Sequence, residues 1–250
     1  GATATDYLRA DPGKTLCALA ERANHAVDED WTSLWQTASR AARHAMDVDE
    51  GDLHEGDVLA TVTEVLPEGG NLFISSSMPV RDLDGFGLPR EEQIMVFGNR
   101  GASGIDGIVS SAFGIAAART APTVCVLGDI ALFHDQNGLL WSREPDCPVV
   151  FVLIDNDGGG IFHMLPIADH EPVFSQFFAT PHGLDFQHTA AIHNLGWSDL
   201  EINDLGTELA TALESGRTSI LRVTSDRETN KRRHEEIAEA VAQHVLDTLR

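Results

Sequence analysis

Lysine, cysteine and long apolar runs are scarce in this 250-residue sequence. Lys14 and Lys231 are its lysines, and its cysteines, Cys17, Cys125 and Cys147, form no CxxC pair. That cysteine pattern argues against a disulfide framework or a structural zinc site. Because no run of about 18 apolar residues occurs and no signal peptide is recognisable, we expect a cytoplasmic protein without a membrane span.

Basic residues are few beside the acidic ones. The chain has 17 Lys and Arg against 39 Asp and Glu, for a formal net charge of -22. Such a charge repels nucleic acid and anionic membranes, which makes both unsuitable partners. The acidic residues are spread along the chain and do not form a disordered tail, so the composition predicts a surface adapted to high salt.

Short apolar strands alternate with amphipathic helices along most of the chain. We expect strands at 71–75, 93–97, 123–127, 149–154 and 219–223. We expect helices at 13–24, 31–46, 57–66, 105–119, 131–141, 185–195, 204–214 and 228–249. This alternation predicts βαβ units in a doubly wound, mostly parallel α/β sheet with helices on both faces.

Two polar side chains directly follow predicted strands and lie 27 residues apart, Asp129 and Asn156. Ligands of doubly wound sheets bind beyond the carboxyl ends of the strands, where these residues would lie. A carboxylate and an amide oxygen are hard donors suited to Mg²⁺ that also holds a diphosphate, and the glycines after Asn156 let the backbone come close. Alternatively, Asp129 caps the next helix and residues 155–158 form only a tight turn. The two positions together favour the metal site.

The spacing of Gly128-Asp129 and Asn156 resembles the cofactor-binding motif of the thiamine-diphosphate-dependent enzymes. The strings that carry the resemblance are 76–82 (SSMPVRD), 98–107 (GNRGASGIDG), 128–160 and 159–166 (GGIFHMLP). The likeness covers roughly residues 30–250 and is closest to a member that acts in menaquinone biosynthesis. The third motif position, glycine in most of the family, is Ile130 here, and such members tolerate this departure.

The resemblance implies thiamine diphosphate and Mg²⁺ or Mn²⁺ as cofactors. The implied metal ligands are Asp129, Asn156 and the main-chain oxygen of Gly158. The other implied cofactor contacts are Gly128, Ile161 and Ile105, the last as a wedge between the two rings of the cofactor.

The resemblance also implies a transferase that decarboxylates 2-oxoglutarate and adds the four-carbon unit to isochorismate. The expected substrate contacts are Ser77, Arg81, Arg100, Phe162 and Leu165. The arginines offer forked donors to carboxylates, while the apolar residues, with Ile161, form a wall. The alternatives are a surface ion pair of Arg81 with Asp82 or Asp84, and simple core packing of the apolar residues.

The sequence contains 11 histidines, and three of them come close together, His182, His188 and His193. Their spacing matches no familiar set of metal ligands, so we expect solvated side chains. His134 and His163 lie within the motifs, and the sequence assigns neither of them a role.

Three other functions remain open. The glycines at 98, 101, 104 and 107 follow a strand, as in NAD- or FAD-binding modules, but their spacing departs from GxGxxG. The chain could also be another thiamine-diphosphate-dependent 2-oxo-acid enzyme, or a ligand-binding half that does no chemistry alone.

Enzymes of this family clamp the cofactor between two related α/β domains, and only one such domain fits in this chain. We expect residues 1–29 to be the tail of a preceding domain with a linker. Residues 30–250 would be the diphosphate- and metal-binding domain of a longer protein that forms homodimers or tetramers. The resemblance places the activating glutamate on the other domain, so no catalytic residue is assigned here and the chain alone should be inactive.

Overall fold

The computed structural model describes residues 7–23, 28–48 and 51–250. The chain divides into two compact units, residues 50–236 and residues 1–49 with 237–250. The predicted boundary at residue 29 concerns a longer protein and stays a prediction. None of the described helices is long and apolar enough to cross a membrane.

The smaller unit contains two helices near the amino terminus. They are α1 (Pro12–Arg22) and α2 (Glu29–Asp47). Each begins after an aspartate whose carboxylate accepts a backbone N–H of the first turn, Asp11 from Lys14 at 2.8 Å and Asp28 from Trp31 at 2.9 Å. Both helices were expected; residue 24, the predicted end of the first, lies outside the described residues. The last part of α9 (Arg227–Thr248) completes this unit.

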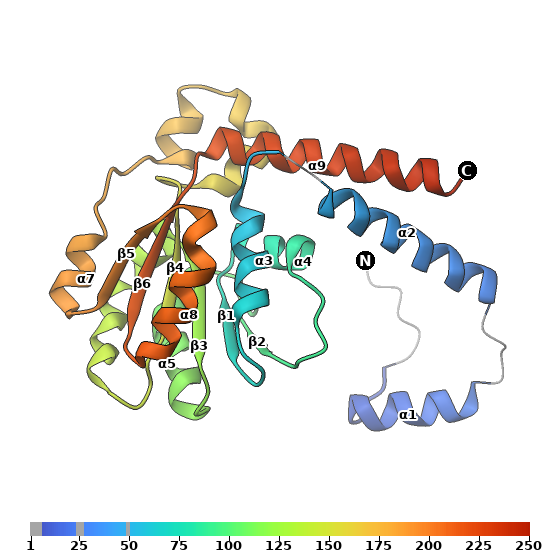
Figure 1. Ribbon diagram of the computed structural model, residues 1–250, viewed down its shortest axis with the longest axis horizontal. Helices are drawn as coiled ribbons and strands as arrows, with labels where there is room; N and C mark the ends of the chain where they lie inside the picture. Colours follow the sequence, from blue (N-terminus) through green and yellow to red (C-terminus); the bar gives the residue numbers. More distant parts are fainter. Residues whose placement is uncertain (1–6, 24–27, 49–50) are drawn as a thin grey trace. The chain divides into compact units, whose positions relative to one another are not determined.

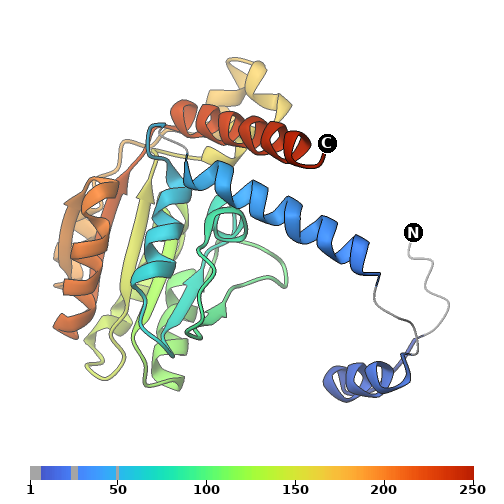
Figure 2. The same cartoon turned by 45° about the vertical axis from the view of Figure 1, so that its right-hand side comes forward.

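The larger unit is built on one parallel sheet of six strands (Figures 1 and 2). The strands are β1 (Asn71–Ile74), β2 (Met95–Phe97), β3 (Thr123–Gly128), β4 (Val150–Asp155), β5 (Gly196–Leu200) and β6 (Ser219–Thr224). Their order is β2-β1-β3-β4-β6-β5, and every neighbouring pair is parallel. The structure therefore confirms the predicted α/β class.

Alternating residues of the central strands enter two separate cores. In β3, Val124 and Val126 pack on the face covered by α3 (Glu55–Val65) and α8 (Leu205–Ser215). Cys125 and Leu127 pack on the opposite face, against α5 (Ile108–Ala118) and its neighbours. Because both faces are buried, these strands are continuous apolar runs, and this is why the sequence predicts them well.

Several elements differ from the expectation. Helix α4 (Met78–Phe86) and the edge strand β5 were not predicted. The expected helix at 131–141 is instead α6 (Asp129–Asp135) followed by the 3₁₀ helix η1 (Gln136–Arg143). Helix α5 begins only after Gly107, whose φ of 66° lies in the left-handed region, so Ile105 belongs to the preceding loop.

The segment after β4 forms short irregular helices. They are the 3₁₀ helices η2 (Gly160–Met164) and η3 (Pro166–Asp169) and the π-helix η4 (Ser175–Ala179). Helix α7 (Gln187–His193) and the 3₁₀ helix η5 (Ile202–Asp204) then flank β5.

The order in which successive strands are added to the sheet reverses beside β1. From β1 the chain passes to β2 on one side, whereas β3 pairs with β1 on the other side and leads on to β4. Such a switch point opens a crevice at the carboxyl ends of the strands, because the two connections leave in opposite directions. The loop after β1, which begins at Ser75, and the start of α6 at Asp129, which directly follows β3, lie at this edge.

Candidate metal and cofactor site

A cavity of about 430 Å³ lies at the switch point, between the loops that follow β1, β2, β3 and β4. Its lining includes these predicted site residues: Ser77, Arg81, Arg100, Ile105, Gly128, Asp129, Asn156, Gly158, Ile161 and Phe162. Leu165 is not among the described lining residues, and 48% of its surface is exposed. The fold thus brings together residues spread over 86 positions, from 77 to 162, although their individual roles stay predictions.

Asp129 lies at the end of β3, and only 2% of its surface is exposed. Its Oδ1 accepts the N–H of Ile130 at 2.6 Å and its Oδ2 accepts the N–H of Gly158 at 2.9 Å. Burial raises the pKa of this carboxyl, and the two N–H groups offset that rise only in part. Asp129 is the first residue of α6, after the N-cap Gly128, so its Oδ1 satisfies a first-turn N–H, whereas its Oδ2 is bound to the segment that follows β4.

Asn156 directly follows β4 and presents two different amide atoms. Its Nδ2 donates to Oε1 of Glu55 at 2.9 Å. Its Oδ1 is buried and accepts no hydrogen bond from any residue that the structure describes. A buried acceptor without a donor lowers the stability of the fold, because its lost hydration is not replaced. A metal ion coordinated by the amide oxygen would compensate for this loss.

Gly158 is a position that only glycine can occupy. Its φ is 141°, and a Cβ there would lie 2.0 Å from the carbonyl oxygen of Ala179. The carbonyl oxygen of Gly158 accepts the N–H of Gly160 at 3.0 Å, which leaves it one further lone pair. With the Asp129 carboxylate and the Asn156 Oδ1 it makes an all-oxygen donor set, which fits Mg²⁺ or Mn²⁺.

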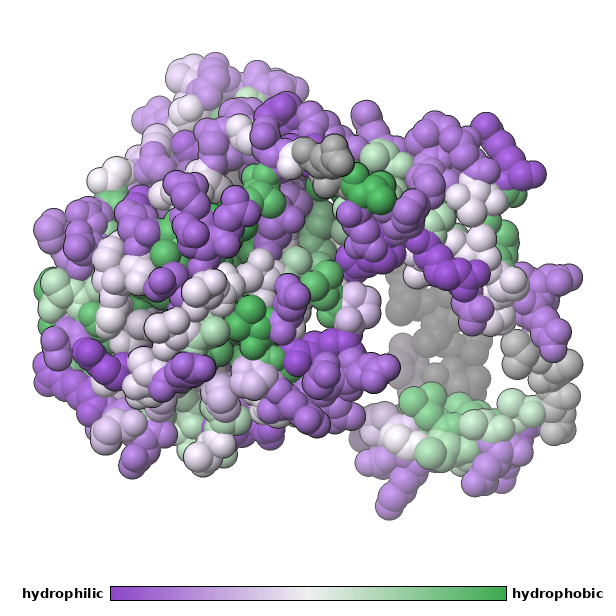
Figure 3. All heavy atoms as spheres, in the orientation of Figure 1, coloured by the Kyte–Doolittle hydropathy of each residue, from purple (hydrophilic) through white to green (hydrophobic). Residues whose placement is uncertain are grey.

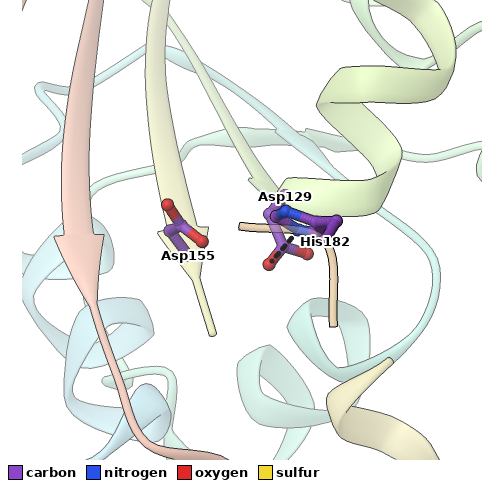
Figure 4. Close-up of side chains that lie close together, drawn as sticks. All are labelled: Asp129, Asp155 and His182. Carbon is purple, nitrogen blue, oxygen red and sulfur yellow. Dashed lines mark ion pairs between the residues drawn. The ribbon is translucent and has the colours of Figure 1, made fainter. Parts of the chain in front are cut away.

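His182 approaches Asp129 from the loop before α7, and here the expectation of solvated histidines is wrong. Its Nε2 lies 3.2 Å from Oδ2 of Asp129, and 16% of the side chain is exposed. Figure 4 shows the imidazole and the carboxylate side by side, with Asp155 of the next strand close by. The Nδ1 atom accepts the N–H of Leu184 at 3.0 Å, and the buried Nε2 atom faces Asp129 without a hydrogen bond to any described residue. His188, in contrast, is 82% exposed, as expected.

Asp129, Asp155 and His182 could in principle hold a cation, since their ligand atoms lie within 4.8 Å of one another. Asp155 is already satisfied, however, because Arg222 Nε donates to its Oδ2 at 2.8 Å. Of these three residues, only Asp129 is also a predicted ligand. The other two predicted ligands, Asn156 and the Gly158 carbonyl, each offer an oxygen of an uncharged group.

Two arginines reach the cavity without a carboxylate partner among the described residues. Arg81 donates to the carbonyl oxygen of Ser77 at 2.5 Å, and Arg100 donates to Ser76 Oγ at 3.3 Å. The alternative ion pair of Arg81 with Asp82 is absent, since Asp82 faces His234 at 2.9 Å. Two cations left without counter-ions in so acidic a protein suit a ligand that carries carboxylates.

Glu55 also lines the cavity, and no pattern in the sequence pointed to it. Its surface is 2% exposed, and burial raises the pKa of its carboxyl, although hydrogen bonds from Asn156 and Ser225 lower it in part. Glu55 begins α3, 101 positions before Asn156, so no local motif joins the two. His163, which the motif contains, is also buried but lies 3.5 Å from Glu228 and is not one of the described cavity residues.

Comparison with solved structures identifies the class. A putative thiamin diphosphate-dependent enzyme of Mycobacterium smegmatis matches 70% of this chain and 32% of its own, with a TM-score of 0.56 and 22% identity. Benzoylformate decarboxylase of Polynucleobacter necessarius matches 72% of this chain and 35% of its own, with a TM-score of 0.57 and 19% identity. At these identities the likeness shows a shared fold.

Curated relatives narrow the class further. The 2-succinyl-5-enolpyruvyl-6-hydroxy-3-cyclohexene-1-carboxylate synthase of Halorubrum lacusprofundi is 40% identical over 97% of this chain, and that of Halobacterium salinarum is 41% identical over 96%. The same synthase of Roseiflexus castenholzii is 52% identical over 56% of this chain. No family model matches the sequence. The chain is homologous, over nearly its whole length, to part of this synthase, and it spans about two fifths of the first two relatives, 43% and 41%.

Proposed function

We propose that the chain is the diphosphate- and metal-binding part of a 2-succinyl-5-enolpyruvyl-6-hydroxy-3-cyclohexene-1-carboxylate synthase. The observation that carries the proposal is the cavity at the switch point, which is lined by every predicted site residue except Leu165. The proposal includes a cytoplasmic homo-oligomeric enzyme of menaquinone biosynthesis, with 2-oxoglutarate and isochorismate as substrates.

The residues of the cavity have distinct tasks in this proposal. Asp129, Asn156 and the Gly158 carbonyl would hold Mg²⁺ or Mn²⁺ against the diphosphate, while Ile105 and Ile161 would contact the rings. Thiamine diphosphate, when bound, supplies the electron sink for decarboxylation of a 2-oxo acid.

The substrate side of the cavity is cationic and apolar. Arg81 and Arg100 would grip substrate carboxylates through their forked N–H donors, and Ser77 would add a hydroxyl. Phe162 would exclude water from the reacting carbon, which strengthens the arginine contacts because the local dielectric falls. Leu165 lies outside the cavity in this structure, so its role as a wall requires closure of η2 over the ligand.

The test is a titration of the 250-residue chain with thiamine diphosphate and Mg²⁺, followed by amide NMR. We expect weak binding, with shifts at Asp129 and Gly158, because half of the cofactor would remain in water. Asp129→Ala should abolish these shifts, and Asp185→Ala, which removes an exposed carboxylate (60% of its side chain), should leave them unchanged. Equal shifts in the Asp129 variant, or the same response to NADH, would contradict the assignment.

Catalysis should need more than this chain. With 2-oxoglutarate, isochorismate, thiamine diphosphate and Mg²⁺, the chain alone should show no turnover, and addition of the amino-terminal part of the synthase should restore it. Turnover at a normal enzyme rate by the chain alone would overturn the proposal that it is one part of a longer catalytic unit.

Self-association is the remaining part of the proposal. Phe133, Leu140 and Trp141, from α6 and η1, are 50%, 53% and 58% exposed. Large apolar side chains grouped in one segment favour burial against another protein surface, here a second copy of the chain. Trp141→Glu should lower the dimer fraction in sedimentation analysis, whereas an unchanged distribution would place the contact elsewhere.

A further inference from the structure

We propose that Glu55 is the positioning residue that fixes the amide of Asn156 with its oxygen toward the metal. This inference rests on the proposed function, in which Asn156 is a metal ligand. Glu55 is the first residue of α3, and its surface is 2% exposed. It lines the same cavity as Asp129 and Asn156, and neither its position nor its type follows from the cofactor motif.

One oxygen of Glu55 receives two donors. Its Oε1 accepts Nδ2 of Asn156 at 2.9 Å and Oγ of Ser225 at 2.6 Å. The backbone of Glu55 is held as well, since its N–H donates to Oδ1 of Asn230 at 3.1 Å. Glu55 is therefore held by its place in α3 and by Asn230 of α9, while Ser225 is a second donor to the same oxygen as Asn156.

This anchored acceptor selects one of the two orientations of the Asn156 amide. A reversed amide would turn its Oδ1 toward Oε1 of Glu55, so that two acceptors would face each other in a buried place. With Nδ2 on Glu55, the Oδ1 atom remains buried and without a donor among the described residues. A metal can use only this oxygen, because the amide nitrogen is not a ligand for a hard cation.

Gly160 provides the space for this orientation. A Cβ at that position would lie 2.6 Å from Nδ2 of Asn156 and would displace the amide from Glu55. The glycines after Asn156 therefore serve the side chain of the ligand as well as the approach of the backbone.

Two substitutions separate acceptor chemistry from volume. Glu55→Leu keeps most of the volume and removes the acceptor, so the Asn156 amide can rotate. Glu55→Gln keeps an Oε1 acceptor and should therefore keep the orientation of the Asn156 amide. Ser225→Ala is the matched control, because it removes the other donor on the same oxygen and leaves the contact to Asn156. Circular dichroism checks that each variant folds.

The first measurement is made without metal or cofactor. In the parent chain the side-chain amide protons of Asn156 should be shifted downfield and exchange slowly. Glu55→Leu should lose both signatures, while Glu55→Gln and Ser225→Ala should retain them. An exchange-averaged amide in the parent, or an unchanged one in Glu55→Leu, would overturn the inference.

The second measurement is the affinity for Mn²⁺ by electron paramagnetic resonance, with thiamine diphosphate present. Glu55→Leu should bind roughly 10- to 100-fold more weakly, as expected when a group that orients a ligand is lost. Equal affinity of this variant and the parent would refute the inference. If the parent chain itself binds no Mn²⁺ even with the rest of the synthase added, the proposed function fails, and the amide signature still decides the role of Glu55.

Discussion

Two buried aspartates lie at the carboxyl ends of neighbouring strands of the sheet, and their carboxylates have very different partners. Asp155, at the end of β4, is 5% exposed and receives Arg222 Nε at 2.8 Å. Asp129, at the end of β3, is 2% exposed and receives two backbone N–H groups and the approach of one imidazole. No arginine or lysine of the described chain pairs with Asp129.

The difference lies in how each buried carboxylate is compensated. Arg222 also reaches Asp199 at 3.0 Å, so β4, β5 and β6 are joined by charges that the protein itself supplies. Asp129 pairs with no arginine or lysine of the described residues, and burial raises the pKa of its carboxyl. A buried carboxylate is costly unless it is paired, so the chain accepts a loss of stability there, and a metal ion would recover it.

The strongest way to break this comparison is to remove the ligand carboxylate. Asp129→Ala should weaken metal-dependent binding of thiamine diphosphate by more than about 100-fold, because a direct ligand matters more than the outer groups whose loss costs roughly 10- to 100-fold. Calorimetry on the complete synthase would measure this. The free energy of unfolding should change little, since an unpaired buried charge is removed along with its hydrogen bonds.

Replacing the other aspartate, Asp155, should lower the free energy of unfolding and leave metal binding unchanged. Asp155→Ala leaves Arg222 with Asp199 alone, and we expect the free energy of unfolding to fall by about 2 kcal/mol, below the usual loss for a fully buried pair because Arg222 is partly exposed. Urea unfolding would show it. Asp199→Ala, at a carboxylate that is 57% exposed, should cost clearly less, and an equal cost at both positions would contradict the distinction.

A third buried carboxylate sharpens the comparison because a titratable group compensates it. Asp82, 1% exposed, lies 2.9 Å from Nε2 of His234, whose Nδ1 faces the carbonyl oxygen of Asn230 at 2.8 Å. Burial lowers the pKa of His234, but the hydrogen bonds to Asp82 and Asn230 raise it more, so the pKa lies above its ordinary value.

The sign of the pH dependence follows from this raised pKa. The stabilisation is complete below the ordinary histidine pKa of about 6.5 and is lost as the pH rises through the higher pKa of the folded state. Unfolding curves from pH 6 upward, compared with His234→Gln, should show this slope only in the parent. The same pH dependence in His234→Gln as in the parent above about pH 6.5 would contradict a raised pKa of His234.

The smallest effect should come from the uncompensated charge of the whole surface. Hydrophilic side chains cover most of the face shown in Figure 3, and the formal net charge is -22. Salt shortens the screening length from about 30 Å at 0.01 M to about 3 Å at 1 M, so repulsion between carboxylates should weaken. The melting temperature should rise by several degrees into molar KCl, and a flat or falling series would exclude a salt-adapted surface.

Local patterns predicted five of the six strands, and they gave the bounds best where both faces of a strand are buried. The runs at 123–127, 149–154 and 219–223 match β3, β4 and β6 to within one residue at either end. The half-buried edge strand β5 contains Ser198 and Asp199 and shows no such run, and it was missed. Helix α4 was missed because Pro79 and Gly85 suggest a loop, although proline fits the first turn of a helix.

The residues of the candidate site also fall into those that local sequence patterns predicted and those that they did not. Its predicted residues belong to strings directly after strands, which topology gathers at one edge. Glu55 contacts Asn156 from 101 positions away, and His182 approaches Asp129 from 53 positions away. Such contacts leave no periodic or motif signal. Equally, only the folded structure shows that Arg81 and Arg100 have no carboxylate partner in the described residues.

The order of the strands in the sheet also determines when each of them can pair during synthesis. Strand β6 lies between β4 and β5, although it follows both in the chain. During synthesis one edge of β4 therefore stays open until residues 219–224 have left the ribosome, and pairings so distant along the chain form slowly. Because Asn156 directly follows β4 and Ser225 directly follows β6, the hydrogen bonds that both donate to Glu55 can form together only when the last strand has entered the sheet.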